Sequence, residues 1–422
     1  MYALMEELYP LCRSLTGDGV RETLRRIGSR IPIDVHEVPT GTQAFDWQVP
    51  KEWNIRDAYI KDEAGNTVLS FRDSNLHVVG YSVPVRERLP LAELKEHLFS
   101  LPEHPDWIPY RTSYYSETWG FCLTHRQLTQ LRDGIYEVVI DSDLTDGHLT
   151  YGECRIPGRT EEEVVIFTHT CHPSLCNDNL SGIALATHLA QALHGLSLRY
   201  TYRFVFAPAT IGSITWLSQN EGQLSRVKHG LVVANAGDPG KLTYKRSRHG
   251  RAEIDCAVTH VLQHSGQPHA VLDFSPWGYD ERQFGSPGIN LPVGRLTRSP
   301  EGTFPEYHTS ADNLQFVRPE CLSESLATVL KTFAVLEGNA RYVNRSPKGE
   351  PQLGRRGLYR KMGGYQDVPR QQLALLWALS FSTGDLSLLD IAEKSGLDFE
   401  SIRAAASDLE ASGLLGPQEK SA

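Results

Sequence analysis

The sequence predicts an α/β protein with a mostly parallel sheet covered by helices, a nested β-rich segment and a small helical domain at the end. From residue 136 onward, apolar strand-like runs alternate with helical patterns, which favours a mostly parallel sheet covered on both faces. Between residues 45 and 141, strand-like pieces rich in Pro, Trp and Tyr indicate β structure. After residue 347, three short helical patterns follow one another.

Length and composition indicate an ordinary globular protein with more than one domain. The 422 residues exceed the usual size of a single domain. The formal net charge of −9 argues against nucleic-acid and membrane partners, because both call for basic surfaces. The sequence contains no apolar run of membrane-spanning length, and its first residues do not follow the signal-peptide pattern. Seven cysteines do not indicate a disulfide framework, so we expect a cytoplasmic enzyme or enzyme-like protein.

The predicted elements define three domains. Helices are expected at residues 2–15, 20–27 and 181–193, and strands at residues 137–140, 164–168, 203–206, 230–233 and 289–294. The main α/β domain is expected to comprise residues 1–45 and 136–345. The nested β-rich domain is expected at residues 46–135, and the C-terminal domain at residues 355–416.

The C-terminal domain carries helical patterns at residues 368–381, 388–395 and 399–411. Three short helices with a turn at Gly396 resemble a winged-helix or helix-turn-helix domain. The last helix has the wrong charge for DNA, because Glu400, Asp408 and Glu410 outnumber the single Arg403. We therefore expect a docking role, with homo-oligomerisation through this domain or the nested domain.

Candidate metal ligands follow the strand at residues 164–168. His169, Cys171 and His172 come directly after this strand, and Asp178 precedes the next helix. In open α/β sheets, ligands bind at the carboxyl ends of the strands. Imidazole and carboxylate groups held at such an edge are what a metal hydrolase requires, with Asp178 free to bridge two ions.

Two later segments supply further candidates, Asp238 after the strand at 230–233 and His308 after a long loop. Simpler interpretations exist for each residue. Asp178 could cap the following helix, Asp238 before a proline could be a turn residue, and His308 could lie on the surface. A structural zinc site made by His169, Cys171, His172 and Cys176 is disfavoured, because no second Cys/His pair follows at suitable spacing. The combination of residues favours a metal centre.

Dispersed motifs make the chain similar to the aminopeptidase-like proteins of the zinc peptidase M28 clan, and most similar to the subfamily named DUF2172 and DUF4910. Members of that subfamily are often described as polysaccharide-biosynthesis proteins with an aminopeptidase-like domain. The matching segments are residues 168–173 (THTCHP), 177–182 (NDNLSG), 211–214 (IGSI), 280–283 (DERQ) and 307–312 (YHTSAD), with 112–115 (TSYY) and 119–123 (WGFCL) in the nested domain. The resemblance covers almost the whole chain and implies a zinc-aminopeptidase-like mixed sheet.

The resemblance also implies a site for one or two zinc ions. Asp178 would bridge the ions, His169 and Asp238 would serve one of them, and His308 the other. His172 is close enough in sequence to compete with His169. The clan usually carries His-x-Asp where this chain has His169-Thr170-Cys171, so the orienting aspartate is missing, and Cys171 could itself bind a metal as thiolate.

The general base that the resemblance implies is absent. The clan carries Glu-Glu at the corresponding turn, and Pro-Glu-Thr is expected in the subfamily, but this chain has Ala209. Alanine cannot accept a proton, and loss of a general base typically costs a factor of about a hundred or more. Glu281 and Asp280 are the candidates to replace it.

The expected function is that of a metal-dependent aminopeptidase-like hydrolase that cleaves an amide or acyl bond of a small aminoacyl or peptide substrate. Substrate contacts are expected from Arg246, Arg248, Tyr307 and Glu306, the arginines being suited to a carboxylate. Ala209 keeps a catalytically impaired pseudoenzyme or binding protein open as an alternative. A second alternative is a single-zinc cyclase or acyltransferase on the same fold.

Overall fold

The computed structural model describes residues 1–358 and 368–418, which form two compact units. The first unit comprises Met1–Gly250 and Pro268–Ala327, and the second comprises Arg251–Gln267 together with the chain from Thr328 onward. The candidate metal ligands all lie in the first unit. Among the described residues, no helix is both long and apolar enough to cross a membrane.

An eight-stranded mixed sheet forms the centre of the first unit, in the order β1-β10-β12-β11-β13-β16-β14-β15. The strands are β1 (Asp34–Pro39), β10 (His148–Ile156), β11 (Glu163–His169), β12 (Thr201–Ala207), β13 (Val227–Val233), β14 (Leu242–Lys245), β15 (His269–Leu272) and β16 (Val293–Thr297). The neighbours β12, β11, β13 and β16 run parallel, as the sequence predicted. Antiparallel pairing at β1, β10 and β14 makes the sheet mixed.

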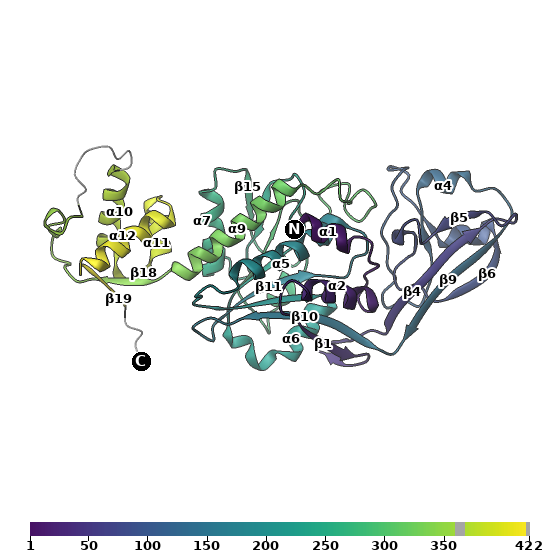
Figure 1. The fold of residues 1–422 in the computed structure, drawn as a ribbon, viewed down its shortest axis with the longest axis horizontal. Coiled ribbons are helices and arrows are strands. Elements are labelled where there is room, and N and C mark those ends of the chain that lie inside the picture. Colours follow the sequence, from purple (N-terminus) through teal and green to yellow (C-terminus); the bar gives the residue numbers. More distant parts are fainter. Residues whose placement is uncertain (359–367, 419–422) are drawn as a thin grey trace. The chain divides into compact units, whose positions relative to one another are not determined.

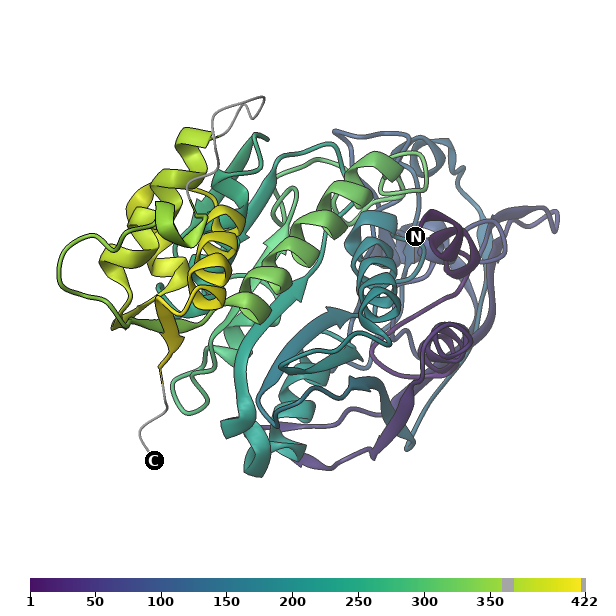
Figure 2. The same cartoon turned by 60° about the vertical axis from the view of Figure 1, so that its left-hand side comes forward.

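Helices cover both faces of this sheet. Helices α1 (Tyr2–Leu8), α2 (Asp18–Gly28) and α5 (Gly182–Leu193) lie on one face, while α6 (Ile211–Gln219) lies on the other (Figures 1 and 2). Every residue of β11 and β12 is therefore buried, which explains their unbroken apolar runs. The first helix, expected to reach residue 15, ends at Leu8, because Pro10 has no backbone N–H with which to continue it.

The nested segment forms its own four-stranded antiparallel sheet, in the order β5-β4-β9-β6 (Figure 1). The strands of this sheet are β4 (Glu52–Lys61), β5 (Thr67–Ser70), β6 (Val85–Pro90) and β9 (Ile135–Thr145). The segment also contains the helices α3 (Leu91–Leu94) and α4 (His125–Gln130) and the parallel pair β7 (Leu98–Phe99) and β8 (Phe121–Cys122). A short hairpin, β2 (Gln43–Ala44) and β3 (Trp47–Gln48), precedes the sheet. This region has a separate hydrophobic core that includes Ile60, Phe121 and Val138. The chain returns from β9 to β10 after only two residues, which ties the two sheets together.

The second unit combines three helices with a three-stranded antiparallel sheet, in the order β18-β17-β19. Its elements are α10 (Val368–Phe381), α11 (Leu388–Ser395), α12 (Phe399–Ala411), β17 (Arg341–Asn344), β18 (Thr383–Ser387) and β19 (Leu415–Pro417), with α7 (Glu253–Gln263) and the later part of α9 (Pro319–Gly338). The sequence predicted the three helices with these bounds. A capping box at Ser387 begins α11, the left-handed Gly396 ends it, and Asp398 caps α12.

Candidate metal centre

The candidate centre lies where the central strand β11 ends. His169 is the last residue of β11, and the chain then passes through a π-helical turn, Cys176–Ser181, into α5. The N-cap residue of α5 is Ser181, and no side chain forms a capping hydrogen bond at this end of the helix. Asp178 therefore does not cap this helix, and its carboxylate is available for other contacts.

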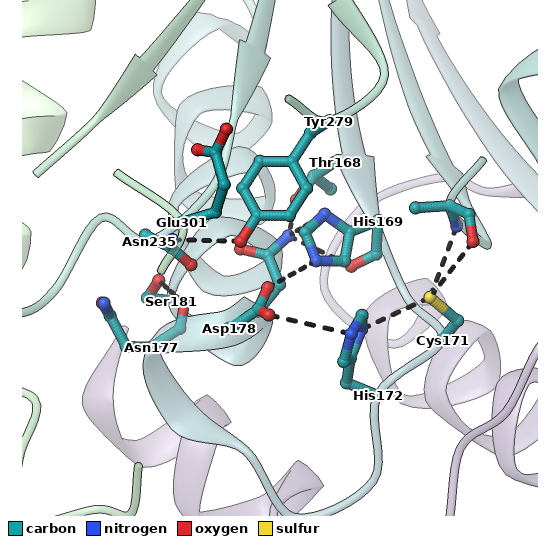
Figure 3. Close-up of polar contacts among 12 residues, drawn as sticks. Thr168, His169, Cys171, His172, Asn177, Asp178, Ser181, Asn235, Tyr279 and Glu301 are labelled. Carbon is teal, nitrogen blue, oxygen red and sulfur yellow. Dashed lines mark hydrogen bonds and ion pairs between the residues drawn. The ribbon is translucent and has the colours of Figure 1, made fainter. Parts of the chain in front are cut away.

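Three imidazoles surround the carboxylate of Asp178. The Nε2 atom of His169 lies 2.7 Å from Asp178 Oδ1. The Nε2 atoms of His308 and His172 lie 3.0 Å and 3.7 Å from Asp178 Oδ2. The possible ligand atoms of His169, His172 and Asp178 all lie within 4.8 Å of one another (Figure 3). His169 and Asp178 are fully buried, whereas the side chain of His308 is 34% exposed and so forms the open side of the cluster.

The electrostatics of the cluster suit metal binding. Burial alone would raise the pKa of Asp178, but the imidazoles of His172 and His169 hold it well below its ordinary value. Burial also lowers the pKa of His172 to about 3. An ionised carboxylate beside a neutral imidazole is the protonation state in which both groups bind a cation.

Asp312, to which the sequence analysis gave no role, holds the turn that carries Asp178. Its carboxylate accepts hydrogen bonds from the backbone N–H of Asn177 at 2.6 Å and of Asp178 at 2.9 Å. Its carbonyl accepts a third bond, from the backbone N–H of Cys176 at 2.9 Å. Asp312 follows His308 by four residues in the matched segment YHTSAD, and that spacing was the available signal.

Asp238, expected to bind metal beside His169, lies in a separate hydrogen-bond network. Its carboxylate accepts hydrogen bonds from Asn177 Nδ2 at 2.9 Å and from Ser299 Oγ at 2.6 Å. It also accepts from the backbone of Gly240 two residues ahead, as an Asx-turn does. The structure does not bring Asp238 into the cluster around Asp178, and its contacts match the turn interpretation.

Cys171 contacts His172 and the turn that contains Ala209. Its Sγ lies 3.3 Å from His172 Nδ1 and accepts a hydrogen bond from the backbone N–H of Ala209 at 3.4 Å (Figure 3). Burial raises the pKa of Cys171, so the side chain remains a thiol at neutral pH. Among the described residues, the cluster of possible ligands contains no cysteine. This arrangement does not form a structural zinc site with Cys176.

The two carboxylates expected to replace the missing base differ in their surroundings. Glu281 is fully buried and accepts a hydrogen bond from Lys245 Nζ at 2.8 Å, with Arg295 Nη1 at 3.4 Å. Lys245 and Arg295 face each other across β14 and β16, so Glu281 is the counter-ion of two buried cations. Asp280, also fully buried, accepts a hydrogen bond from Ser213 at 2.7 Å. Burial raises the pKa of Asp280 to about 7, which is near the value that suits a general base at neutral pH.

The residues expected to contact substrate fall into two groups. Arg246 pairs with the exposed Asp273, and Arg248 donates to Asn290, so both arginines make contacts outside the cluster. Tyr307 stacks on His308, with ring centroids 3.9 Å apart, and so lies at the cluster. The backbone carbonyl of Glu306 closes the turn that contains His308, by accepting a hydrogen bond from the hydroxyl of Thr309.

Comparisons with known proteins agree with this fold. A family model described as "Domain of unknown function (DUF4910)" matches residues 2–339, and a model described as "winged helix-turn-helix" matches residues 340–417. The chain is 55% identical over 409 residues to a Clostridium acetobutylicum protein named "Putative polysaccharide biosynthesis protein with aminopeptidase-like domain", covering 97% of this chain and 94% of that protein.

Solved structures with a similar fold include a "putative peptidase" and a zinc aminopeptidase. A crystal structure of a "putative peptidase" from Clostridium acetobutylicum has a TM-score of 0.94 at 52% identity, covering 99% of this chain and 96% of that one. BSAP, a zinc aminopeptidase from Bacillus subtilis, has a TM-score of 0.58 at 12% identity, covering 79% of this chain and 93% of that one. The second likeness shows the fold alone.

Proposed function

Because this chain belongs to the DUF4910 family and has the fold of the zinc aminopeptidases, we propose that it is a metal-dependent aminopeptidase-like hydrolase. It would cleave an amide or acyl bond of a small aminoacyl or peptide substrate. The observation that carries the proposal is the convergence of His169, His172 and His308 on the ionised carboxylate of Asp178. Catalytic metal sites combine such ligands at the end of a rigid strand.

The residues present fit one zinc ion better than two. His169, Asp178 and His308 would hold the ion, with His172 as a further nitrogen ligand, and imidazole with carboxylate is a donor set that zinc prefers. A second ion would need Asp238, whose oxygens already accept bonds from Asn177 and Ser299. When bound, the ion would polarise the substrate carbonyl and lower the pKa of a water molecule.

The side chain of Tyr307 has a proton free to donate to the substrate. Asn235 Nδ2 donates both to the backbone carbonyl of Ser299 at 3.3 Å and to the hydroxyl of Tyr279 at 3.1 Å. The hydroxyl of Tyr279 then donates to that of Tyr307 at 3.4 Å. Because each hydroxyl in this series accepts one bond, the proton of Tyr307 remains available for an oxygen that gains negative charge during the reaction.

Proton transfer is the weak step of the proposed mechanism. Ala209 packs against the same core cluster as Cys171 and Tyr279 and offers no acceptor. Burial raises the pKa of Asp280, and the charge of His169 opposes this increase. We therefore expect slow turnover, with Asp280 as proton acceptor. A ligand-binding protein on the same fold is the second candidate, and Ala209 is the observation that favours it.

All seven cysteines are free thiols in the structure. Free thiols persist in reducing compartments, so we place the protein in the cytoplasm. The acidic helix α12 supports a docking or homo-oligomerisation role for the second unit more than a DNA-binding role.

A panel of aminoacyl-p-nitroanilides, with free and blocked α-amines, tests the function. The zinc-loaded protein should release p-nitroaniline from substrates with a free amine, and Asp178→Asn should abolish the release. Binding of the same compounds without release, by both the wild type and Ala209→Glu, would favour the ligand-binding protein. Absence of both binding and release would contradict the proposal.

A further inference from the structure

The two ring nitrogens of His169 face different neighbours. Nε2 lies 2.7 Å from Asp178 Oδ1, within the proposed metal centre (Figure 3). Nδ1 lies 3.2 Å from the amide nitrogen of Asn179. A neutral imidazole carries a proton on one of its nitrogens, and only the other nitrogen can accept a hydrogen bond or bind a metal. The group that faces Nδ1 therefore determines whether Nε2 is free to bind zinc.

The carboxamide of Asn179 is held against the end of β11. Asn179 is 2% exposed, and its Nδ2 donates to Thr168 Oγ1 at 2.9 Å and to the backbone carbonyl of His169 at 3.1 Å. Its Oδ1 lies beside Gly182, the first residue of α5, where a Cβ would come within 2.4 Å of that oxygen. A larger residue at position 182 would therefore displace the carboxamide. The local packing keeps this amide beside the ring of His169.

The amide nitrogen of Asn179 favours the tautomer of His169 that cannot bind zinc through Nε2. An amide nitrogen donates and does not accept, so Nδ1 of His169 accepts from Asn179 and carries no proton. The ring proton then lies on Nε2, which donates it to Asp178 Oδ1. Zinc can bind Nε2 only when this proton has moved to Nδ1. Nδ1–H would then need an acceptor in the place that the amide nitrogen occupies.

The oxygen of the same carboxamide can be that acceptor. Among the described residues, none donates a hydrogen bond to Asn179 Oδ1, although this atom is buried. A half-turn of the carboxamide exchanges its oxygen with its NH₂ group, which has nearly the same size. Oδ1 would then accept from Nδ1–H of His169 and from the hydroxyl of Thr168, in place of the bond to the His169 carbonyl. The NH₂ group would lie close to the carbonyl oxygen of Val233, which is 2.6 Å from the same Cβ position on Gly182.

Cys171 does not perform this task for His169. It stands where the resemblance to the M28 clan implies an orienting aspartate, but its Sγ contacts His172 Nδ1 at 3.3 Å and the backbone N–H of Ala209 at 3.4 Å. Metal-binding histidines almost always donate their second N–H to a carboxylate, a carbonyl or water. In this chain Asn179 is in contact with Nδ1 of His169 and carries such an oxygen.

We propose that Asn179 is the positioning residue of His169 and that rotation of its carboxamide selects the tautomer of the ring. With Nδ2 toward Nδ1, the ring proton lies on Nε2 and forms the bond to Asp178. With Oδ1 toward Nδ1, the proton lies on Nδ1 and Nε2 is free for zinc. This inference rests on the proposed function, because it concerns a ligand of the same ion.

The tautomer of His169 tests the proposal without requiring turnover. Nitrogen NMR of protein with isotope-labelled histidine, at about pH 8 where imidazoles are neutral, distinguishes a protonated ring nitrogen from an unprotonated one. The signal of His169 is identified by its loss in His169→Gln. The proton should lie on Nε2 in the metal-free wild type, and on Nδ1 in metal-free Asn179→Asp, because a carboxylate can only accept. A proton on Nδ1 in the metal-free wild type, or on Nε2 in Asn179→Asp, would overturn the proposal.

Zinc affinity, measured by competition with a chromogenic chelator, provides a second readout. Asn179→Leu has no acceptor for Nδ1–H, so its zinc affinity should fall about 10–100-fold, whereas Asn179→Asp should bind zinc at least as tightly as the wild type. Thr168→Val removes the hydroxyl beside the carboxamide and should show a smaller loss. Thr187→Val is the matched control, because it removes an equally buried hydroxyl that bonds the carbonyl of Ile183 within α5, and it should bind zinc as the wild type does.

The two Asn179 variants separate positioning from packing and from the proposed function. A role in packing alone would weaken zinc binding in both variants. Such a shared loss, or unchanged affinity in both, would overturn the role of Asn179 and leave the hydrolase proposal intact. Failure of the wild type to bind zinc would overturn both proposals. If Asn179→Leu folds poorly, the tautomers of the wild type and of Asn179→Asp still decide the outcome.

Discussion

The carboxylate of Asp312 accepts a 2.9 Å hydrogen bond from the backbone N–H of Asp178 and so fixes the central ligand of the proposed metal centre. Both residues are fully buried, although they are 134 positions apart in the sequence. The turn that carries Asp178 has irregular backbone angles and would not hold its shape through helical hydrogen bonds alone. The geometry around Asp178 therefore depends on a residue outside the ligand set.

Replacement of Asp312 by asparagine should weaken metal binding. An amide presents one oxygen where the carboxylate presents two, so the N–H of Asn177 or of Asp178 would lose its acceptor. We expect zinc affinity to fall about 10–100-fold, measured by competition with a chromogenic chelator. The exposed Asp273 provides a matched control, and Asp273→Asn should bind zinc as the wild type does. Unchanged affinity in Asp312→Asn would refute its supporting role.

His308 and His172 should both contribute to zinc binding. His308→Ala and His172→Ala each remove an imidazole that faces Asp178, so each variant should bind zinc at least ten-fold more weakly than the wild type. The exposed His194, which lies outside the cluster, serves as the control in His194→Ala. If one of the two variants keeps full affinity, that histidine is not a ligand.

Ala209→Glu should raise activity. A carboxylate at this position would supply the proton acceptor that the resemblance to the M28 clan implies here, and hydrolysis of the most reactive aminoacyl-p-nitroanilide should increase about a hundred-fold. Ala209→Gln has almost the same volume and no basic group, so it controls for the change in packing. An equal response to both substitutions would show that proton acceptance at this position does not limit the reaction.

Glu281 should matter for stability rather than for chemistry. Glu281→Gln leaves Lys245 buried without its counter-ion and Arg295 paired with Glu301 alone, and we expect a loss of about 3–5 kcal/mol in the free energy of unfolding. Zinc content of the folded protein should not change. Asp106→Asn, which breaks an exposed pair with Arg126, should leave the unfolding midpoint where it is. A variant of Glu281 that is stable but inactive would instead support a role as base.

The second unit should lose stability as the pH falls. Burial, with His264 as a smaller cause, lowers the pKa of His260 from its ordinary value of 6.5 to about 4. The unfolded chain therefore binds the proton more readily, so the stability contributed by neutral His260 is complete above about pH 6.5, falls between pH 6.5 and 4, and falls no further below pH 4.

Hydrogen exchange at Phe399 measures this effect directly, because its backbone N–H donates to His260 Nε2 at 3.0 Å. The protection factor of this amide should decrease from pH 7 to pH 4.5, since a protonated imidazole cannot accept the bond. In His260→Gln, the protection factor of the Phe399 amide should vary with pH only as much as the protection factors of neighbouring amides do. A pH-independent protection factor in the wild type would contradict the assignment.

The sequence predicted the parallel centre of the sheet, the helix after it and the three C-terminal helices, because each has a strong local pattern. It also predicted His169, Asp178 and His308 as metal ligands. The fold brings their side chains together from 9 and 130 positions apart, and their role as ligands stays a prediction. Local patterns could not show that the carboxylate of Asp238 accepts hydrogen bonds from Asn177 and Ser299, since those contacts arise only from the packing of three loops.

The same limit explains the residues that sequence reasoning missed or misjudged. Asp312 acts on backbone groups, so its only signal in the sequence was its spacing from His308 in the segment YHTSAD. Glu281 was a candidate to replace the missing base, and only the structure shows that it pairs with two cations on distant strands. Tyr110 belongs to the nested domain, and only the folded structure shows that its backbone N–H donates to the carbonyl of His308. The three-domain division made from the sequence stays a prediction.

The metal content of untagged protein, measured by inductively coupled plasma mass spectrometry, tests the central claim most directly. The account predicts one zinc ion per chain in the wild type after incubation with zinc and removal of the excess, and almost none in Asp178→Asn. Two ions per chain would contradict the single-ion site. Absence of zinc from the wild type, or undiminished zinc in Asp178→Asn, would contradict the assignment of the cluster as a metal centre.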